Sequence, residues 1–162
     1  MMPNKKTIGI TGAGGSLGKA LTKEFSSHGH KIIGFTHNRK PQKLVEEGPN
    51  EWVYWECGKE FLLENSLSKI DILILNHGIY DYKEDLEKSI EINATSKIKL
   101  LKLFEKISLS QSIESSPKEI WINTSEAEIL PALNPCYEIS KSLIGQVVTF
   151  KRNCNSQNES RN

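Results

Sequence analysis

Hydrophobic and polar positions follow one another in blocks that favour strands and helices in turn. Short apolar runs, typical of buried strands, occupy 5–11, 31–36, 51–56, 71–76 and 119–125. Between these runs, apolar residues recur every three or four positions. This spacing predicts helices over 16–29, 84–108 and 137–151, and shorter helices near 42–48 and 60–67. The run "DILILN" is almost wholly apolar, as expected for a strand that is covered on both faces of its sheet.

The order of these elements predicts the fold class. Strands that alternate with helices form parallel sheets, because each helix returns the chain across the sheet in a right-handed crossover. We therefore expect an α/β fold with a doubly wound parallel sheet of the Rossmann type and about five strands. We expect one domain over 1–152 and a polar disordered tail over 153–162, because "NCNSQNESRN" lacks apolar periodicity.

Composition excludes several classes of protein. The 162 residues are 37% hydrophobic and carry a formal net charge of +1, which leaves no electrostatic footprint for nucleic acid or an anionic membrane. The sequence contains no apolar run of membrane-spanning length and no signal-peptide pattern, so we expect a cytoplasmic protein. The three cysteines are widely spaced without a CxxC pair, so we expect neither a metal site nor a disulfide framework.

A cluster of glycines lies where the first predicted strand turns into the first predicted helix, in "TGAGGSLG". Backbone N–H groups at the start of a helix bind phosphate, and side chains at such a turn would block a pyrophosphate. A tight turn without a ligand would also use glycines, but the strand before and the helix after favour dinucleotide binding. The candidate phosphate-binding residues are Gly12, Gly14, Gly15, Ser16, Leu17 and Gly18.

Three residues further along could perform acid–base chemistry. Tyr137 and Lys141 are four apart in a predicted helix and therefore share a face. Free tyrosine has a pKa of about 10, and a nearby ammonium group lowers it towards the useful range. Ser125 follows an apolar strand, at the carboxyl end where open α/β sheets bind ligands. Each residue alone is more often a surface or turn residue, so the combination carries the argument.

Together with "NHG" at 76–78 and Asn93 in the long helix, these motifs resemble the short-chain dehydrogenase/reductase family over about 5–152. The resemblance implies that Tyr137 exchanges a proton with the substrate oxygen and that Ser125 polarises the carbonyl. It implies that Lys141 binds the nicotinamide ribose and lowers the tyrosine pKa, and that Asn93 holds a water of a proton relay. The nicotinamide would carry the hydride, with Tyr137 and Lys141 against it.

The end of the second strand, "GFTHNRK", bears on the choice of cofactor. An NAD enzyme normally places an acid there, whereas this chain has no carboxylate to repel a 2′-phosphate. His37, Asn38 and Arg39 therefore favour NADP(H) over NAD(H), unless they form a basic surface loop. The resemblance adds contacts to the cofactor from Glu56, Cys57, Asn76 and Gly78. We interpret His77, by contrast, as structural.

The resemblance also implies that the last strands of the family, and part of its substrate pocket, are missing here. The sequence is compatible with three hypotheses about function. The first is an NADP(H)-dependent oxidoreductase that interconverts a small-molecule carbonyl and alcohol. The second is a non-catalytic nucleotide-binding or interaction module. The third, an epimerase-like protein suggested by the spacing Gly12, Gly15 and Gly18, ranks below them. A homodimer or larger homo-oligomer is compatible with all three.

Overall fold

A computed structural model describes residues 5–38, 48–83, 85–110, 117–131 and 133–159, with side chains up to residue 153. The chain divides into two compact units. The first comprises Met1–His77 and Lys99–Asn123, and the second comprises Gly78–Ile98 and Thr124–Asn162.

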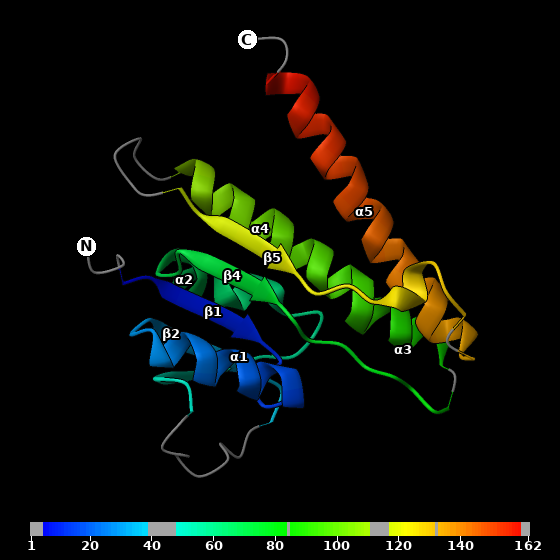
Figure 1. The fold of residues 1–162 in the computed structure, drawn as a ribbon, viewed down its shortest axis with the longest axis horizontal. Coiled ribbons are helices and arrows are strands. Elements are labelled where there is room, and N and C mark those ends of the chain that lie inside the picture. The colour runs from blue at the N-terminus through cyan, green and yellow to red at the C-terminus, as the bar shows by residue number, and fades with distance from the viewer. Residues whose placement is uncertain (1–4, 39–47, 84, 111–116, 132, 160–162) are drawn as a thin grey trace. The chain divides into compact units, whose positions relative to one another are not determined.

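The first unit contains the whole sheet. Its five strands are β1 (Thr7–Thr11), β2 (Lys31–Thr36), β3 (Glu51–Tyr54), β4 (Ile72–Leu75) and β5 (Glu119–Ile122). All pairings are parallel, in the order β3-β2-β1-β4-β5, and Figure 1 shows β2, β1, β4 and β5 side by side. The chain therefore winds from β1 to β3 and then returns to β4 on the other side of β1. This confirms the predicted doubly wound, Rossmann-type sheet, with its switch of direction between β1 and β4.

The helices of the first unit connect consecutive strands. Helix α1 (Ser16–Ser27) joins β1 to β2, and η1 (Glu60–Leu63) with α2 (Glu64–Ser68) leads from β3 to β4. Most of α4 (Ser96–Ser110) also belongs to this unit, and the helix leads into β5. The short helix predicted near 42–48 lies almost entirely outside the described residues.

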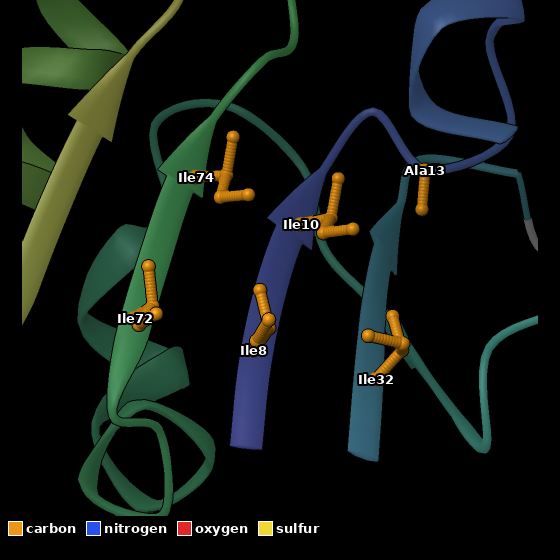
Figure 2. Packing of buried hydrophobic residues seen from close by; sticks show 6 residues of the cluster. All are labelled: Ile8, Ile10, Ala13, Ile32, Ile72 and Ile74. Carbon is orange, nitrogen blue, oxygen red and sulfur yellow. The ribbon is translucent and has the colours of Figure 1, made fainter. Parts of the chain in front are cut away.

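The core of this unit follows from the period-two pattern of the strands. Ile8 and Ile10 of β1, Ile32 of β2, and Ile72 and Ile74 of β4 point to one face of the sheet (Figure 2). Partly buried Leu21 and Phe25 of α1 pack against this cluster. Burial of each isoleucine side chain contributes about 1.5–3 kcal/mol to the stability of the fold. The packed strands therefore fix the position of the β1–α1 turn.

The second unit is helical. Its elements are α3 (Leu86–Ile90), the π-helical turn η2 (Glu91–Thr95), the start of α4, the 3₁₀ turn η3 (Glu126–Glu128) and α5 (Pro135–Glu159). The single helix predicted over 84–108 thus contains a π turn, which the apolar spacing did not reveal. No helix in the described part of the chain is both long enough and apolar enough to span a bilayer.

Helix α5 is longer than predicted. It continues to Glu159, so the backbone over 153–159, expected to be a disordered tail, is helical. The prediction of a tail rested on the polar composition of this segment and on its lack of apolar periodicity. No glycine or proline occurs between Lys151 and Glu159, so the sequence contains no strong stop signal there. Residues 160–162 lie outside the described part of the chain.

Candidate functional site

Two glycines of the β1–α1 turn are required by the fold of the first unit. Gly12 has a φ of +67°, and a Cβ there would lie 2.9 Å from the Cα of His77. A Cβ at Gly18 would lie 2.2 Å from the carbonyl oxygen of Gly12. The turn is further held by a hydrogen bond from the Gly12 N–H to the Phe35 oxygen at 3.0 Å. These contacts explain Gly12 and Gly18 without any ligand.

Gly14 and Gly15 have no such explanation. A Cβ at Gly14 would meet no heavy atom of the described residues within 4 Å, and one at Gly15 would make only an ordinary contact of 3.4 Å. Gly15 is the N-cap of α1, where it offers no side chain to accept from the first N–H groups of the helix. Ser16 and Leu17, the next two residues, are exposed. The turn therefore presents backbone donors and the positive end of a helix dipole on an open surface, as an anion site requires.

Thr11 joins the carboxyl ends of β1 and β4. Its hydroxyl oxygen accepts from the backbone N–H groups of Asn76 at 2.9 Å and His77 at 3.2 Å, and it lies 2.8 Å from Nδ1 of His77. The His77 ring is buried and meets the Trp55 ring edge-on, with centroids 4.9 Å apart. His77 therefore packs in the interior of the unit, which agrees with its structural interpretation. Asn76 accepts a bond from Asn123 at 3.1 Å, which links the end of β4 to that of β5.

The residues predicted to determine cofactor preference follow β2, and two further predicted cofactor contacts follow β3. His37 and Asn38 are exposed, and the Asn38 N–H donates to the hydroxyl of Thr36 at 3.1 Å. Arg39 lies outside the described residues. Glu56 accepts from the Tyr54 hydroxyl and from Lys59 Nζ at 2.8 Å, so its carboxylate already has two partners. Cys57 beside it is half-buried.

In the second unit, Asn93 holds the segment that follows β4. Its Oδ1 accepts from the Ile79 N–H at 2.7 Å, and its Nδ2 donates to the Ile79 oxygen at 2.9 Å and to the Ser140 hydroxyl at 2.9 Å. Asn93 is fully buried and stands in the π turn η2. Such turns interrupt the regular helical bonding and are frequent at functional sites.

Gly78 lies between Asn93 and Lys141. A Cβ at Gly78 would be 2.9 Å from Asn93 Oδ1 and 3.5 Å from Lys141 Nζ. The Nζ of Lys141 lies 5.4 Å from the centroid of the Tyr137 ring, within cation–π range, and Lys141 is buried. The Tyr137 hydroxyl donates to Ser125 Oγ at 3.4 Å, a long bond. All four predicted catalytic residues therefore lie in one unit, and the contacts link them into one cluster.

Capping bonds orient two of these residues. Ser125 is the N-cap of η3, where its Oγ accepts from the Ala127 N–H at 3.2 Å and Glu128 accepts from the Ser125 N–H at 3.3 Å. Asn134 precedes α5 and accepts from the Tyr137 N–H at 2.9 Å. Pro135 follows it at the first helical position, which favours the start of a helix.

Sequence reasoning missed three residues of this cluster. Tyr80 lies against the catalytic candidate Tyr137, with ring centroids 5.1 Å apart, and nothing in the sequence pattern pointed to that contact. Lys97 is fully buried, and Glu128 contacts both Ser125 and the backbone near Gly145. Lys97 could have been noticed, because it stands four residues after Asn93 on the apolar side of the predicted helix.

Burial shifts the titration of Lys97. Loss of solvation lowers the pKa of Lys97 from 10.5 to about 7, with a further decrease from the charge of Lys141. The carboxylate of Glu128 acts in the opposite direction. The second unit therefore contains two buried lysines, Lys97 and Lys141, and burial lowers the pKa of Lys97.

Comparison with known proteins gives consistent matches over most of the chain. The sequence profile of the family described as NAD dependent epimerase/dehydratase matches residues 8–151. A monoglucosyldiacylglycerol epimerase from Synechocystis sp. is 36% identical over 154 residues, which are 91% of this chain and 37% of that protein. The chain thus spans little more than a third of the length of this curated relative.

Two solved structures illustrate the shared fold. The serine dehydrogenase of Escherichia coli superposes with a TM-score of 0.76 at 21% identity, over 91% of this chain and 74% of that one. A short-chain dehydrogenase from Leptospira borgpetersenii with bound NAD⁺ superposes with a TM-score of 0.73 at 18% identity, over 95% of this chain and 67% of that one. At these identities the likeness shows the fold alone.

Proposed function

The chain belongs to the NAD-dependent epimerase/dehydratase family, and on this premise we propose that it catalyses a nicotinamide-dependent redox step at a carbon bearing a hydroxyl or carbonyl group. The observation that carries the proposal is the contact of the Tyr137 hydroxyl with Ser125 Oγ at 3.4 Å, with Lys141 Nζ 5.4 Å from the tyrosine ring. Residues 1–152 are proposed to form the nucleotide-binding domain.

In the proposed reaction, Tyr137 exchanges a proton with the substrate oxygen. When the substrate is an alcohol, the Tyr137 oxygen accepts the hydroxyl proton. When it is a carbonyl, the Tyr137 hydroxyl donates one. The Ser125 hydroxyl donates to the same oxygen as negative charge develops on it. The Lys141 ammonium, beside the tyrosine ring, stabilises negative charge on the Tyr137 oxygen. The nicotinamide, when bound, supplies or removes the hydride at the adjacent carbon.

The cofactor is proposed to be NADP(H) in preference to NAD(H). Backbone N–H groups at the start of α1, from Ser16 onward, would bind the pyrophosphate, and exposed His37 and Asn38, with Arg39, would bind the 2′-phosphate. Fluorescence titration tests this, and we expect NADPH to bind at least about tenfold more tightly than NADH. An equal affinity, or a preference for NADH, would remove the proposed role of these three residues.

The role of Tyr137 is tested by a matched pair of variants. Tyr137→Phe removes only the hydroxyl, so we expect turnover to fall by at least about a hundredfold while NADPH affinity changes little. Tyr82→Phe makes the same chemical change at a tyrosine that is 89% exposed, and it should retain full turnover. If Tyr137→Phe were as active as the unmodified chain, Tyr137 would not be the acid–base group. Nucleotide binding without turnover in the unmodified chain would instead support the non-catalytic module.

Epimerisation is a second candidate, favoured by the identity of 36% with the Synechocystis epimerase. In an epimerase, the hydroxyl carbon is oxidised and then reduced again from the opposite face, so the cofactor is not consumed. The name of that relative describes a glucosyl lipid as its substrate. We propose a glycolipid as the substrate class here too, because the segment between Ser125 and Tyr137 exposes three aliphatic side chains: Ile129 at 84%, Leu130 at 55% and Leu133 at 92%.

A glucosyl lipid and an alkyl glucoside with a short chain distinguish these possibilities. For an epimerase, NMR should show conversion of the sugar without net oxidation or reduction of the nucleotide. Ile129→Ser and Leu133→Ser should raise KM for the lipid severalfold and leave KM for the short glucoside unchanged, because only the lipid reaches the aliphatic side chains. Stoichiometric conversion of the nucleotide would favour the simple oxidoreductase. An equal effect on both glucosides would exclude the aliphatic contact.

A further inference from the structure

Tyr80 is an aromatic residue beside the candidate catalytic tyrosine for which the proposed acid–base chemistry has no use. Its ring lies against the Tyr137 ring, with centroids 5.1 Å apart and planes inclined by 50°. Tyr80 is nevertheless 41% exposed, so part of the residue stays open to solvent. Small-molecule sites are lined mainly by apolar and aromatic side chains around a few polar groups. An exposed aromatic ring next to Tyr137 therefore points to a contact with the substrate.

Hydrogen bonds fix the backbone on both sides of Tyr80. The residue before it, Ile79, is bonded through its N–H and its carbonyl oxygen to the Asn93 side chain, at 2.7 Å and 2.9 Å. The carbonyl oxygen of the residue after it, Asp81, accepts from Asn134 Nδ2 at 3.0 Å. Tyr80 is therefore held in place, although it lies in a segment without regular secondary structure.

Asn134 ties this segment to the start of α5. The same side chain that donates to Asp81 also accepts from the Tyr137 N–H at 2.9 Å through its Oδ1. The Asp81 carboxylate adds an ion pair with Lys88 of α3, at 3.3 Å. Asn134 and Asp81 are both buried. Bonds within the chain thus set the separation of Tyr80 and Tyr137, so the Tyr80 ring is preorganised beside the candidate catalytic group.

The position of Tyr80 suits the substrate class proposed above, which contains a sugar ring. In the proposed reaction the substrate oxygen bonds the Tyr137 hydroxyl and Ser125 Oγ, which lie 3.4 Å apart. A pyranose ring attached to that oxygen must lie beside Tyr137, which the Tyr80 ring adjoins. The axial C–H groups of a β-glucoside give the sugar a weakly polar face, which packs favourably on the electron-rich face of an aromatic ring.

We propose that Tyr80 is a substrate-binding residue, against which the C–H face of a sugar ring packs while the reacting hydroxyl group bonds Tyr137 and Ser125. This inference rests on the proposed function, because a sugar reaches the Tyr80 ring only if Tyr137 and Ser125 bind one of its oxygens. The segment after β4 then recognises the sugar, and the aliphatic side chains between Ser125 and Tyr137 recognise its lipid chain.

The kinetic test uses a short-chain alkyl β-glucoside as substrate and compares variants of the full chain. Tyr80→Leu keeps an apolar side chain but removes the ring, so KM should rise at least about fivefold while kcat stays within about twofold. Tyr80→Phe keeps the ring and should restore KM. Phe61→Leu removes a ring that is 67% exposed on η1, and it should leave both constants unchanged. A fall in kcat at unchanged KM in Tyr80→Leu would mean that Tyr80 only supports Tyr137, which overturns the proposal.

A second measurement does not depend on turnover. The same glucoside is mixed with the chain and NADPH, which cannot oxidise it, and the aromatic protons of the protein are saturated by NMR irradiation. Saturation should pass mainly to the C–H protons on one face of the sugar. This transfer should fall in Tyr80→Leu and persist in Tyr80→Phe and Phe61→Leu, with thermal melting confirming that each variant is folded.

The outcomes separate this inference from the proposed function. Equal transfer in Tyr80→Leu, or no transfer in the unmodified chain, would overturn the sugar contact even if the chain turns over a substrate. Transfer that depends on the Tyr80 ring, without turnover of the glucoside, would support the sugar contact and count against the proposed redox step.

Discussion

The side chain of Asn93 bonds both polar groups of Ile79, with 2.7 Å between Asn93 Oδ1 and the Ile79 nitrogen and 2.9 Å between Nδ2 and the Ile79 oxygen. A single amide thus replaces a strand partner for a segment that has left the sheet. These bonds hold Gly78, the residue before Ile79, beside Lys141. They therefore shape the candidate site as well as the fold.

Asn93→Ala should therefore destabilise the chain substantially. The substitution leaves the Ile79 N–H and C=O without their partner in the interior, which costs about 2–4 kcal/mol of the free energy of unfolding. Urea denaturation measures this loss. Asn65→Ala, at an exposed position of α2, serves as the control and should change the free energy by less than about 0.5 kcal/mol. A loss of that small size at Asn93 would show that the bonds to Ile79 contribute little.

Gly14 and Gly18 of the first turn should serve different purposes, nucleotide binding and stability of the fold. Gly14→Ala places its methyl group in open space, so the unfolding free energy should change by less than about 1 kcal/mol, whereas NADPH affinity should fall severalfold. Gly18→Ala forces a methyl group to 2.2 Å from the Gly12 oxygen and should destabilise the fold by about 1–3 kcal/mol or more. Thermal melting and fluorescence titration of both variants provide the comparison. Unimpaired NADPH binding by Gly14→Ala would argue against a phosphate at this turn.

Lys97→Met should make the chain more stable at neutral pH. In the unfolded chain Lys97 has its ordinary pKa of 10.5, and in the folded chain burial lowers this to about 7. Between these values the unfolded state binds a proton that the folded state lacks, so the stability contributed at this position rises with pH across that window. The advantage of Lys97→Met is therefore greatest below about pH 7, on the order of a few kcal/mol, and disappears above pH 10.5.

Denaturation of both proteins from pH 6 to pH 10 would measure this difference, within the range over which the fold survives. Lys102→Met provides the matched control, because Lys102 is exposed and should give a flat difference curve. A constant difference for Lys97→Met across the same range would mean that Lys97 titrates alike in the folded and unfolded states.

The ionised Asp81 carboxylate should stabilise the fold near neutral pH, and this contribution should be lost in acid. A bond from the Lys83 backbone, and then the nearby Lys88 ammonium at 3.3 Å, lower the pKa of Asp81. A carboxyl group with a lowered folded pKa contributes stability above its unfolded value of 3.8, and that stability is lost as pH falls through the folded pKa. Asp81→Asn should therefore flatten the acid limb of the stability curve, as measured by melting from pH 6 to pH 2. An unchanged acid limb would exclude this contribution.

The sequence by itself determined the order of strands and helices, because the period of apolar residues reports local backbone geometry. It also indicated Ser125, Tyr137 and Lys141 as candidate catalytic residues, because their spacing and their places in a strand end and a helix can be read from the sequence. It did not show where α5 ends, because that helix has no stop signal after Lys151.

Only the tertiary structure decided what individual residues contact. The sequence treats Gly12, Gly14 and Gly18 alike, yet the packing requires the first and last and leaves Gly14 open. In the same way, Lys97 resembles the exposed lysines near it in the sequence, and only the structure shows that its side chain is fully buried. Burial and electrostatic coupling depend on segments that are distant in the chain, and a local pattern carries no information about their distances.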